Sequence, residues 1–227
     1  AEGMNSHLRM LSGIETYQTD YNQVAVIAKA EFEKPHHNVA YERFTSEGPL
    51  ALLPVGSHEM AVVLIADKDE KQKWLAASDE RYSDEIIYRI GYELGEVKQL
   101  SPRHVWDLTL MLPKNVVKER LILIGNSAHS LHPIAGQGLN LGFRDAAELL
   151  PYFQYAGGLP TAHDLKRYER ARRKDALKVA GATDFLVRGF GIEWPGVPTL
   201  RNFALKGVPW LTPLKKRIAR FGMGVKY

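Results

Sequence analysis

The sequence contains no cysteine. Disulfides and thiolate metal sites are therefore excluded, and a chain without them is typical of a reducing compartment. Long apolar runs are absent too: the longest, residues 60–66, is far shorter than the roughly 18 residues that span a bilayer. With 227 residues, of which 45% are hydrophobic, the chain is long enough for a substantial core in one or two domains. We therefore expect a cytoplasmic globular protein.

Acidic residues are scarce at the end of the chain. From Arg188 onward, eight lysines and arginines stand against Glu193 alone, and aromatic residues are interleaved with them. Such a composition is typical of a segment that contacts an anionic membrane surface or a partner, although it also fits a solvated helical end. Nucleic acid is the weakest of these alternatives, and we expect none. We expect residues 191–227 to be a basic aromatic tail that makes peripheral contact with the inner face of a membrane or with a partner.

The middle of the chain has the pattern of a sheet with helices on one side. Turn residues separate short β-rich runs, which predict strands near residues 23–28, 40–44, 50–53, 59–66 and 97–112. Helices are predicted near residues 71–77 and 84–94. We interpret this block as a mainly antiparallel sheet domain.

After residue 121 the pattern changes to strand, glycine-rich loop and helix. The strand is predicted over residues 121–124 and the helix over residues 137–150, with an inward-facing stripe of Leu139, Gly142, Phe143, Ala146 and Leu150. Thr161 and Asp164 form a capping-box pattern that opens a second long helix. That helix carries its core positions at helical spacing: Leu165, Tyr168, Arg172, Ala176, Val179, Thr183 and Leu186.

The loop GNSAHSLHPIAGQGLNLGFRDA, residues 125–146, admits four interpretations. A dinucleotide fingerprint needs its glycines directly after the strand, whereas about ten residues intervene here. A metal site at His129 and His132 lacks a nearby carboxylate to complete the ligand set, and we expect no metal. A flavin contact would use the glycines for close backbone approach and the helix start for negative charge. A tight turn without a ligand stays open as well.

The complete string favours the flavin. It resembles the second FAD-binding motif of the flavin-dependent aromatic hydroxylases, GDAAHxxxPxxGQGxNxGxxDA, and the opening EGMNSHLR resembles their DGxxSxxR segment. AYERFT at residues 40–45, followed by GPLALLP at 48–54, resembles the branch that hydroxylates ubiquinone precursors such as 2-polyprenyl-6-methoxyphenol. The likeness covers residues 1 to about 190.

The resemblance implies a mixed α/β (α+β) fold: a partial FAD-binding domain of the p-hydroxybenzoate hydroxylase type with an inserted, mainly antiparallel substrate-binding sheet domain. Its parts would be residues 1–12 and 113–190 for the FAD domain and residues 13–112 for the substrate domain. It also implies FAD as cofactor and NAD(P)H as electron donor. The family's GxGxxG segment, which holds the ADP half of FAD, has no counterpart here. We therefore expect an N-terminally truncated fragment that is inactive by itself.

The family's site residues carry over position by position. Gly125 and Asn126 would lie by the ribityl chain, and Pro133 near the reactive edge of the ring. The main chain of Gly136, Gln137, Gly138, Leu139 and Asn140 would line the pyrimidine side, and Gly3, Ser6 and Arg9 would belong to the segment that handles cofactor and NAD(P)H. Asn126 and Glu2 each replace a usual aspartate. No catalytic base is assigned.

The function implied by the resemblance is oxygenation of a polyprenylated phenol with O₂, in ubiquinone biosynthesis. It also implies that the partner of the chain is the membrane surface, contacted peripherally, or a ubiquinone-biosynthesis complex. Tyr41 and Arg43 on a predicted strand are candidates to face the phenol, although an ordinary exposed strand face explains them equally well. Two other functions stay open: a non-catalytic, membrane-associated interaction module of the same fold, and an aromatic hydroxylase with a soluble substrate.

Overall fold

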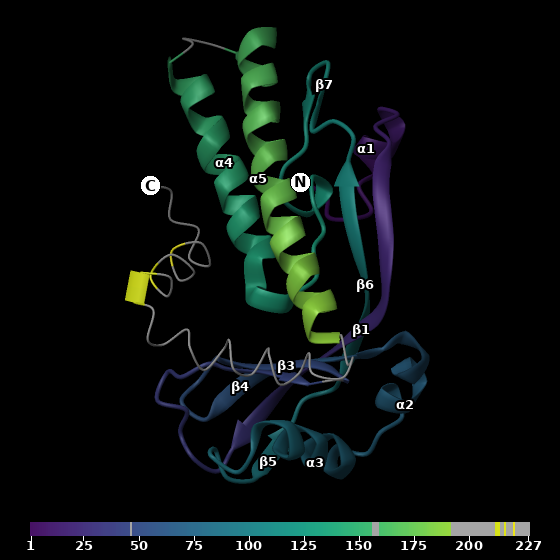
Figure 1. Ribbon diagram of the computed structural model, residues 1–227, viewed down its shortest axis with the longest axis vertical. Coiled ribbons are helices and arrows are strands. Elements are labelled where there is room, and N and C mark those ends of the chain that lie inside the picture. The colour runs from purple at the N-terminus through teal and green to yellow at the C-terminus, as the bar shows by residue number, and fades with distance from the viewer. Residues whose placement is uncertain (46, 156–158, 192–211, 214–215, 217–219, 221–227) are drawn as a thin grey trace. The chain divides into compact units, whose positions relative to one another are not determined.

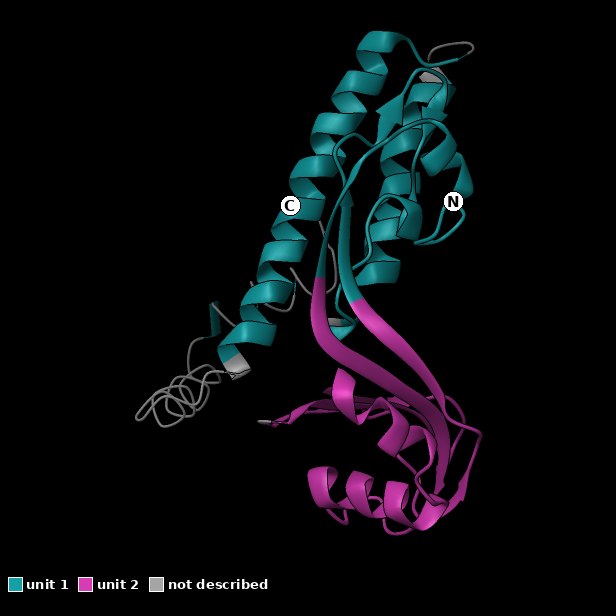
Figure 2. Cartoon of the chain, turned by 90° about the vertical axis from the view of Figure 1, so that its right-hand side faces the viewer, with its two compact units in different colours: residues 1–19, 109–227 teal, residues 20–108 magenta. Residues whose placement is uncertain are grey.

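The chain divides into two compact units (Figure 2). Unit 1 contains residues 1–19 and 109–227, and unit 2 contains residues 20–108. The computed structural model describes residues 1–45, 47–155 and 159–191, with the single positions 212, 213, 216 and 220 (Figure 1). The sequence interpretation put the boundaries at residues 12/13 and 112/113, and its assignment of units to cofactor and substrate stays a prediction. The expected tail, residues 191–227, lies almost entirely outside the described residues.

An antiparallel sheet organises unit 2. Its strands run in the order β2-β3-β4-β1-β5, and β6 also pairs with β1. They are β1 (Thr16–Phe32), β2 (Tyr41–Thr45), β3 (Gly48–Pro54), β4 (Glu59–Asp67), β5 (Val97–Leu100) and β6 (His104–Pro113). Burial along β3 and β4 alternates between buried and half-buried residues. Such alternation is expected because successive side chains of a strand point to opposite faces of a sheet.

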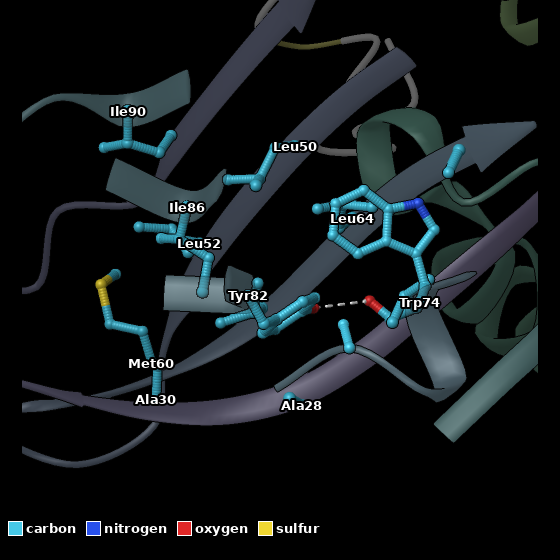
Figure 3. Close-up of a cluster of buried hydrophobic side chains, with 14 of the residues drawn as sticks. Ala28, Ala30, Leu50, Leu52, Met60, Leu64, Trp74, Tyr82, Ile86 and Ile90 are labelled. Atoms are coloured by element: carbon cyan, nitrogen blue, oxygen red, sulfur yellow. Dashed lines mark hydrogen bonds between the residues drawn. The ribbon is translucent and has the colours of Figure 1, made fainter. Parts of the chain in front are cut away.

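The main core of unit 2 lies between one face of this sheet and the helix α3 (Asp79–Ile90). Ser78 caps this helix by accepting a hydrogen bond from the Arg81 N–H, and Gly91, at φ 93°, ends it. Tyr82, Ile86 and Ile90 point from the helix into a cluster of leucines on β3 and β4 (Figure 3). The predicted start at residue 84 is five residues late, because a helix's first turn needs a cap rather than apolar residues.

Short helices complete the cover of this face. The 3₁₀ helix η1 (Lys68–Glu70) leads into α2 (Lys71–Leu75), whose Trp74 is buried. Its indole packs edge-on against the ring of Tyr82, with 6.1 Å between ring centroids. The opposite face of the sheet carries a smaller apolar cluster, formed by Ala25, Ile65 and Leu108 with half-buried Tyr21, Ile27 and Val63.

Two long helices dominate unit 1. α4 (Gln137–Tyr155) and α5 (Ala162–Gly191) pack against each other and lie side by side in Figure 1. The capping box at the start of α5 is confirmed: the Thr161 hydroxyl accepts from the Asp164 N–H, while the Asp164 carboxylate accepts from the Thr161 N–H. The predicted core positions Tyr168, Arg172 and Ala176 of α5 are buried, as are Val179 and Thr183.

The remaining elements of unit 1 are short. They are α1 (His7–Leu11), β7 (Val117–Lys118), β8 (Leu121–Ile122), and the 3₁₀ helices η2 (Gly125–Ser127) and η3 (Ile134–Gly136). The predicted strand over residues 121–124 is reduced to the two-residue β8, which pairs with β7. The predicted strand over residues 97–112 divides into β5 and β6 around Pro102, which has no N–H to donate.

The orientation predicted for α4 is wrong. Leu139, Phe143 and Leu150, expected to face inward, are 68%, 65% and 54% exposed. Leu141 and Asp145 are instead buried on the opposite side of the helix, at 0% and 1% exposure. The charged Asp145 is thus buried on the inner side of the helix, where hydrophobic periodicity predicts apolar residues. Within the described part of the chain, every helix falls short of the length and apolarity required to cross a membrane.

Candidate functional site

The glycine-rich loop of unit 1 is held in shape by its backbone. Gly125 and Gly136 have φ values of 61° and 58°, in the left-handed region that favours glycine. Between them, Ser130 and Met111 exchange two backbone hydrogen bonds of 2.9 Å, which fasten the middle of the loop to β6. Each end of the loop is therefore a turn that glycine permits, and its centre is tied to a strand.

Open space lies beside the second half of this loop. A Cβ atom added at Gly125, Gly136 or Gly138 would meet no described heavy atom within 4 Å. Gln137 and Gly138 are also the first residues of α4. Bare main chain and the positive end of a long helix dipole therefore meet beside this open space.

Close packing fixes where α4 meets the loop. A Cβ added at Gly142 would come within 3.4 Å of the Cα of Gly125. This is the lower limit of ordinary van der Waals contact, so a side chain larger than alanine at residue 142 would press against the start of the loop. Glycine at residue 142 thus allows the backbone of α4 to pack closely against the backbone of the loop at Gly125.

A buried carboxylate connects the loop to both long helices. Asp145 Oδ2 accepts hydrogen bonds from the Gly125 N–H at 2.8 Å and from His129 Nε2 at 2.7 Å. Its Oδ1 accepts from Arg172 Nε, also at 2.7 Å. The side chains of Asp145, His129 and Arg172 are only 2–3% exposed. Asp145 lies on α4, Arg172 on α5, and the other two donors on the loop.

The charges of this cluster offset one another. Burial alone raises the pKa of the Asp145 carboxyl, but the hydrogen bonds from His129, Gly125 and Arg172 outweigh burial, so that its pKa is lowered. Burial likewise works against the charged form of Arg172, whereas Asp145 and Asp175 raise its pKa. Because an ionised carboxylate can only accept, Nε2 of His129 carries the proton. Its Nδ1 has no hydrogen-bond partner among the described residues.

Asp175 extends the cluster toward the surface. Its two oxygens accept from Arg172 Nη1 at 2.7 Å and from Arg144 Nη1 at 3.0 Å. Arg172 Nη2 also donates to the Leu141 carbonyl of α4 at 3.3 Å. The guanidinium of Arg172 therefore bridges the two helices through both charged and neutral acceptors.

Arg9 joins the opening segment of the chain to the same loop. Its Nη1 donates to the Ser127 carbonyl at 3.0 Å, across 118 residues of sequence, and its Nη2 donates to the Met4 carbonyl at 2.6 Å. Ser6 caps α1 at the Arg9 N–H, and Glu2 accepts from the Ser6 hydroxyl at 2.7 Å. The two motifs noted in the sequence are thus in direct contact.

The predicted cofactor residues all belong to unit 1. Gly125 and exposed Asn126 belong to η2, half-buried Pro133 caps η3, and Gly136 ends η3. Buried Gln137, Gly138, exposed Leu139 and Asn140 form the first turn of α4. Gly3, at φ 80°, and buried Arg9 belong to the opening segment. Their contact with a flavin stays a prediction.

The two substrate candidates belong to unit 2. Tyr41 and Arg43 lie on β2, directly opposite Leu52 and Leu50 of β3. Opposite residues of an antiparallel pair share a face, and both leucines are buried in the main core. Tyr41 and Arg43 therefore occupy the edge of the helix-covered face of the sheet, and their role toward a substrate stays a prediction.

The sequence interpretation set the metal site aside because it expected no carboxylate near His129 and His132, yet the carboxylate of Asp145 accepts a hydrogen bond from His129. Among the described residues, no three histidine, cysteine or acidic side chains converge on a point that could hold a metal. Arg172 in the predicted inward stripe of α5 was the available signal, because a buried guanidinium requires a buried acceptor.

We expect Asp145→Asn to destabilise the protein by about 3 kcal/mol, since it leaves the buried Arg172 guanidinium without its full counter-charge. Urea unfolding monitored by circular dichroism measures the change. The matched control is Asp184→Asn on α5, which removes the carboxylate of a surface ion pair with Arg188 and should cost less than about 1 kcal/mol. Equal losses in the two variants would contradict a special role for the buried cluster.

His132 makes a separate prediction about pH. Burial lowers its pKa to about 4, and its Nδ1 accepts from the Ile134 N–H at 3.2 Å. Below pH ~6.5, the unfolded chain therefore binds a proton that the folded chain does not bind. The free energy of unfolding consequently decreases as the pH is lowered. We expect a loss of about 2.5 kcal/mol between pH 7 and pH 4.5 that His132→Asn abolishes. Parallel pH profiles of the two proteins in urea unfolding would refute this.

Comparison with known proteins agrees with this geometry. Residues 1–183 match the family model described as "FAD binding domain". Over 99% of its length, the chain is 36% identical to "Ubiquinone hydroxylase UbiL" of Rhodospirillum rubrum, of which it covers 53%. Over 97% of its length, the chain is 30% identical to human "Ubiquinone biosynthesis monooxygenase COQ6, mitochondrial", and it covers 55% of that protein.

A solved structure shows the same fold. The p-nitrophenol 4-monooxygenase PnpA from Pseudomonas putida DLL-E4 matches with a TM-score of 0.76 at 16% identity, over 97% of this chain and 58% of that one. The chain thus spans about half the length of the curated relatives it matches. Since the family model covers the opening segment, the glycine loop, α4 and most of α5, the chain belongs to the FAD-binding-domain family of the flavin-dependent aromatic hydroxylases.

Proposed function

We propose that this chain supplies the flavin-ring side of an FAD-dependent monooxygenase that hydroxylates a polyprenylated phenol, of the 2-polyprenyl-6-methoxyphenol type, in ubiquinone biosynthesis. The observation that carries the proposal is the family match over residues 1–183, which includes the whole glycine loop. The names of the relatives in R. rubrum and human support the pathway.

The glycine loop fits a flat, partly anionic ring. Gly136 and Gly138 leave open space beside bare main chain, and the start of α4 favours negative charge there. Residues 136–140 would hold the pyrimidine side, Gly125 and Asn126 the ribityl chain, and Pro133 the reactive edge. When bound, FAD supplies the redox chemistry, in which NAD(P)H provides electrons and O₂ provides the oxygen atom that enters the phenol ring.

The chain's own residues position that ring. The Asp145 cluster fixes the start of the loop through the Gly125 N–H, and Arg9 fixes its first turn through the Ser127 carbonyl. Both contacts are made by buried charged side chains whose other hydrogen bonds are also satisfied within unit 1. The main chain that would face the flavin is therefore held before the cofactor arrives, which reduces the entropy lost on binding.

For the substrate, we propose the second face of the unit 2 sheet. Ala25, Ile27, Val63 and Ile65 lie on this face, and Val63 pairs with Ala51 of β3 on the same side. Ile27, Ala51 and Val63 are only half-buried, and the charged residues Glu42, opposite Ala51, and Lys29, opposite Ala61, flank them on the same face. A polyprenylated phenol is mostly apolar, so this surface suits it better than the helix-covered face, which carries Tyr41 and Arg43.

FAD binding is the first test. Flavin fluorescence should be titrated on this chain alone and on the chain joined to the unmatched half of a relative. We expect binding at least by the joined form, because the open glycine surface can contact only part of so large a cofactor. Absence of binding by both forms would overturn the proposal and favour a non-catalytic interaction module of the same fold.

Gly138→Ala refines this test. Its Cβ would enter the space beside the loop without touching the protein, so we expect normal thermal stability but FAD affinity at least tenfold lower. Gly181→Ala is the matched control, since that glycine lies within α5 and its added Cβ also meets no described atom within 4 Å. Unchanged FAD affinity in Gly138→Ala would remove the loop from the cofactor site.

We also propose peripheral contact with the membrane through the basic aromatic tail, because a polyprenylated substrate resides in the bilayer. The tail lies outside the described residues except for positions 191, 212, 213, 216 and 220, so composition alone supports this step. Deleting residues 192–227 should abolish sedimentation with anionic vesicles at low salt, and salt should weaken binding of the intact chain. Undiminished binding of the shortened chain would contradict the tail's role.

A further inference from the structure

The exposed side of α5 is strongly basic in its first half. Between residues 164 and 178, every exposed residue except Leu177 is a lysine or an arginine. These cations are Lys166, Arg167, Arg170, Arg173, Lys174 and Lys178. With 3.6 residues per turn, they lie within an arc of about 140° and extend for about 18 Å along the helix. We call these six residues the α5 basic face.

The acidic residues of the same stretch are engaged elsewhere. Glu169 accepts the backbone N–H groups of Val116 and Val117 at 2.9 and 3.3 Å. Asp175 accepts from two other arginines, and Asp164 belongs to the capping box that opens the helix. Within the described part of the chain, no carboxylate forms an ion pair with the α5 basic face. Its charge is therefore not compensated from within unit 1.

The α5 basic face also repels itself. Arg170 has Lys166 and Lys174 four residues away, and Arg167 and Arg173 three residues away. Side chains at these spacings are neighbours on a helix, and like charges there destabilise it. A surface that weakens its own helix in water breaks a local rule of stability, and such exceptions are expected where a protein meets a ligand or a partner. The partner here must be anionic.

The make-up of the face favours a lipid surface over a protein. The centre of a protein interface is depleted of charged residues and enriched in aromatic ones, whereas charge dominates the α5 basic face. A row of four to eight lysines and arginines on an amphipathic helix is instead typical of contact with anionic lipids. Such a surface is extended and needs no shaped partner groove.

Exposed apolar side chains accompany the cations. Leu177 is 53% exposed within the basic face, and Phe185, farther along the same side of α5, is 75% exposed. A helix that lies on a membrane combines basic residues with apolar ones that enter the boundary between headgroups and acyl chains. Duplex nucleic acid shares the anionic charge but offers no comparable apolar layer.

We propose that the α5 basic face docks on the anionic headgroups of a membrane, with Leu177 and Phe185 directed toward the acyl chains. The proposal deepens the peripheral contact proposed above, but its site is a folded surface of α5 rather than the tail. Neither FAD nor substrate takes part in it, so it can be tested apart from the hydroxylase reaction.

Vesicle sedimentation tests the proposal on the full chain at low salt. The vesicles contain equal parts of phosphatidylglycerol and phosphatidylcholine, and vesicles of phosphatidylcholine alone serve for comparison. We expect binding to the anionic vesicles only. The double variant Arg170→Glu with Lys174→Glu should bind them at least tenfold more weakly. Its thermal stability should be unchanged or higher, because each new glutamate lies four residues from a remaining lysine of the face, Lys166 or Lys178.

Lys34→Glu with Arg81→Glu is the matched control. Both residues are exposed cations of unit 2, and neither side chain has an ion-pair partner among the described residues. The two double variants therefore change the net charge equally, but only one of them alters the α5 basic face. Vesicle binding should survive in the control. Equal losses in the two variants, or undiminished binding of the α5 variant, would overturn the proposal.

Deletion of the tail separates the two membrane contacts. Both are expected to contribute, so loss of either should weaken binding of the intact chain. If deletion abolishes binding while the α5 variant binds normally, the tail is the contact and the present proposal fails. If the α5 variant loses binding while the shortened chain keeps it, the basic face is supported and the tail's role is contradicted. Equally tight binding of a DNA duplex, lost only in the α5 variant, would assign the face to nucleic acid and overturn the proposal.

Discussion

The hydrogen bonds of the Asp145 carboxylate hold unit 1 together. Through one ionised group, they fix the N–H of Gly125, the ring of His129 and the guanidinium of Arg172, and so they set the loop against both long helices. A buried ion pair is not stabilising merely because it exists, since removing its ions from water is costly. Here both carboxylate oxygens are used, which makes the geometry specific: the helix can sit in only one rotation.

That rotation decides what unit 1 presents to its surroundings. With Asp145 inward, the first turn of α4 offers bare backbone to the open space beside Gly138, and the apolar residues follow outward along the same helix. The open space beside the glycines and the exposed apolar face of α4 are thus two consequences of one constraint. Arg9 adds a second fastening at Ser127, so the loop is held at its start by a helix and at its first turn by the opening segment.

Local patterns predicted most elements but not their long-range relations. Strands β2, β3 and β4 and the capping box at Thr161 follow from alternation and spacing within a few residues, and the structure agrees with them. The rotation of α4 could not be predicted in this way, because hydrophobic periodicity finds an apolar face without showing what covers it. The role of Asp145 depends on its hydrogen bonds to Arg172, 27 residues later, and to Gly125, and local patterns do not show such distant partners. The motif resemblance located the candidate loop, whereas the buried cluster of Asp145, His129 and Arg172 that holds it was found only in the three-dimensional structure.

The division of unit 1 into two separate stretches of sequence has a consequence for biosynthesis. Unit 2 is continuous, so its sheet and helices can be completed while the ribosome is still adding the residues that follow. Unit 1 must wait: the Arg9–Ser127 bond spans 118 residues, and the Asp145 cluster needs α5 to emerge. Closure over so long a separation is slow relative to local contacts. During translation, the guanidinium of Arg9, which is buried in the folded chain, therefore remains without its partner loop until unit 2 has been synthesised.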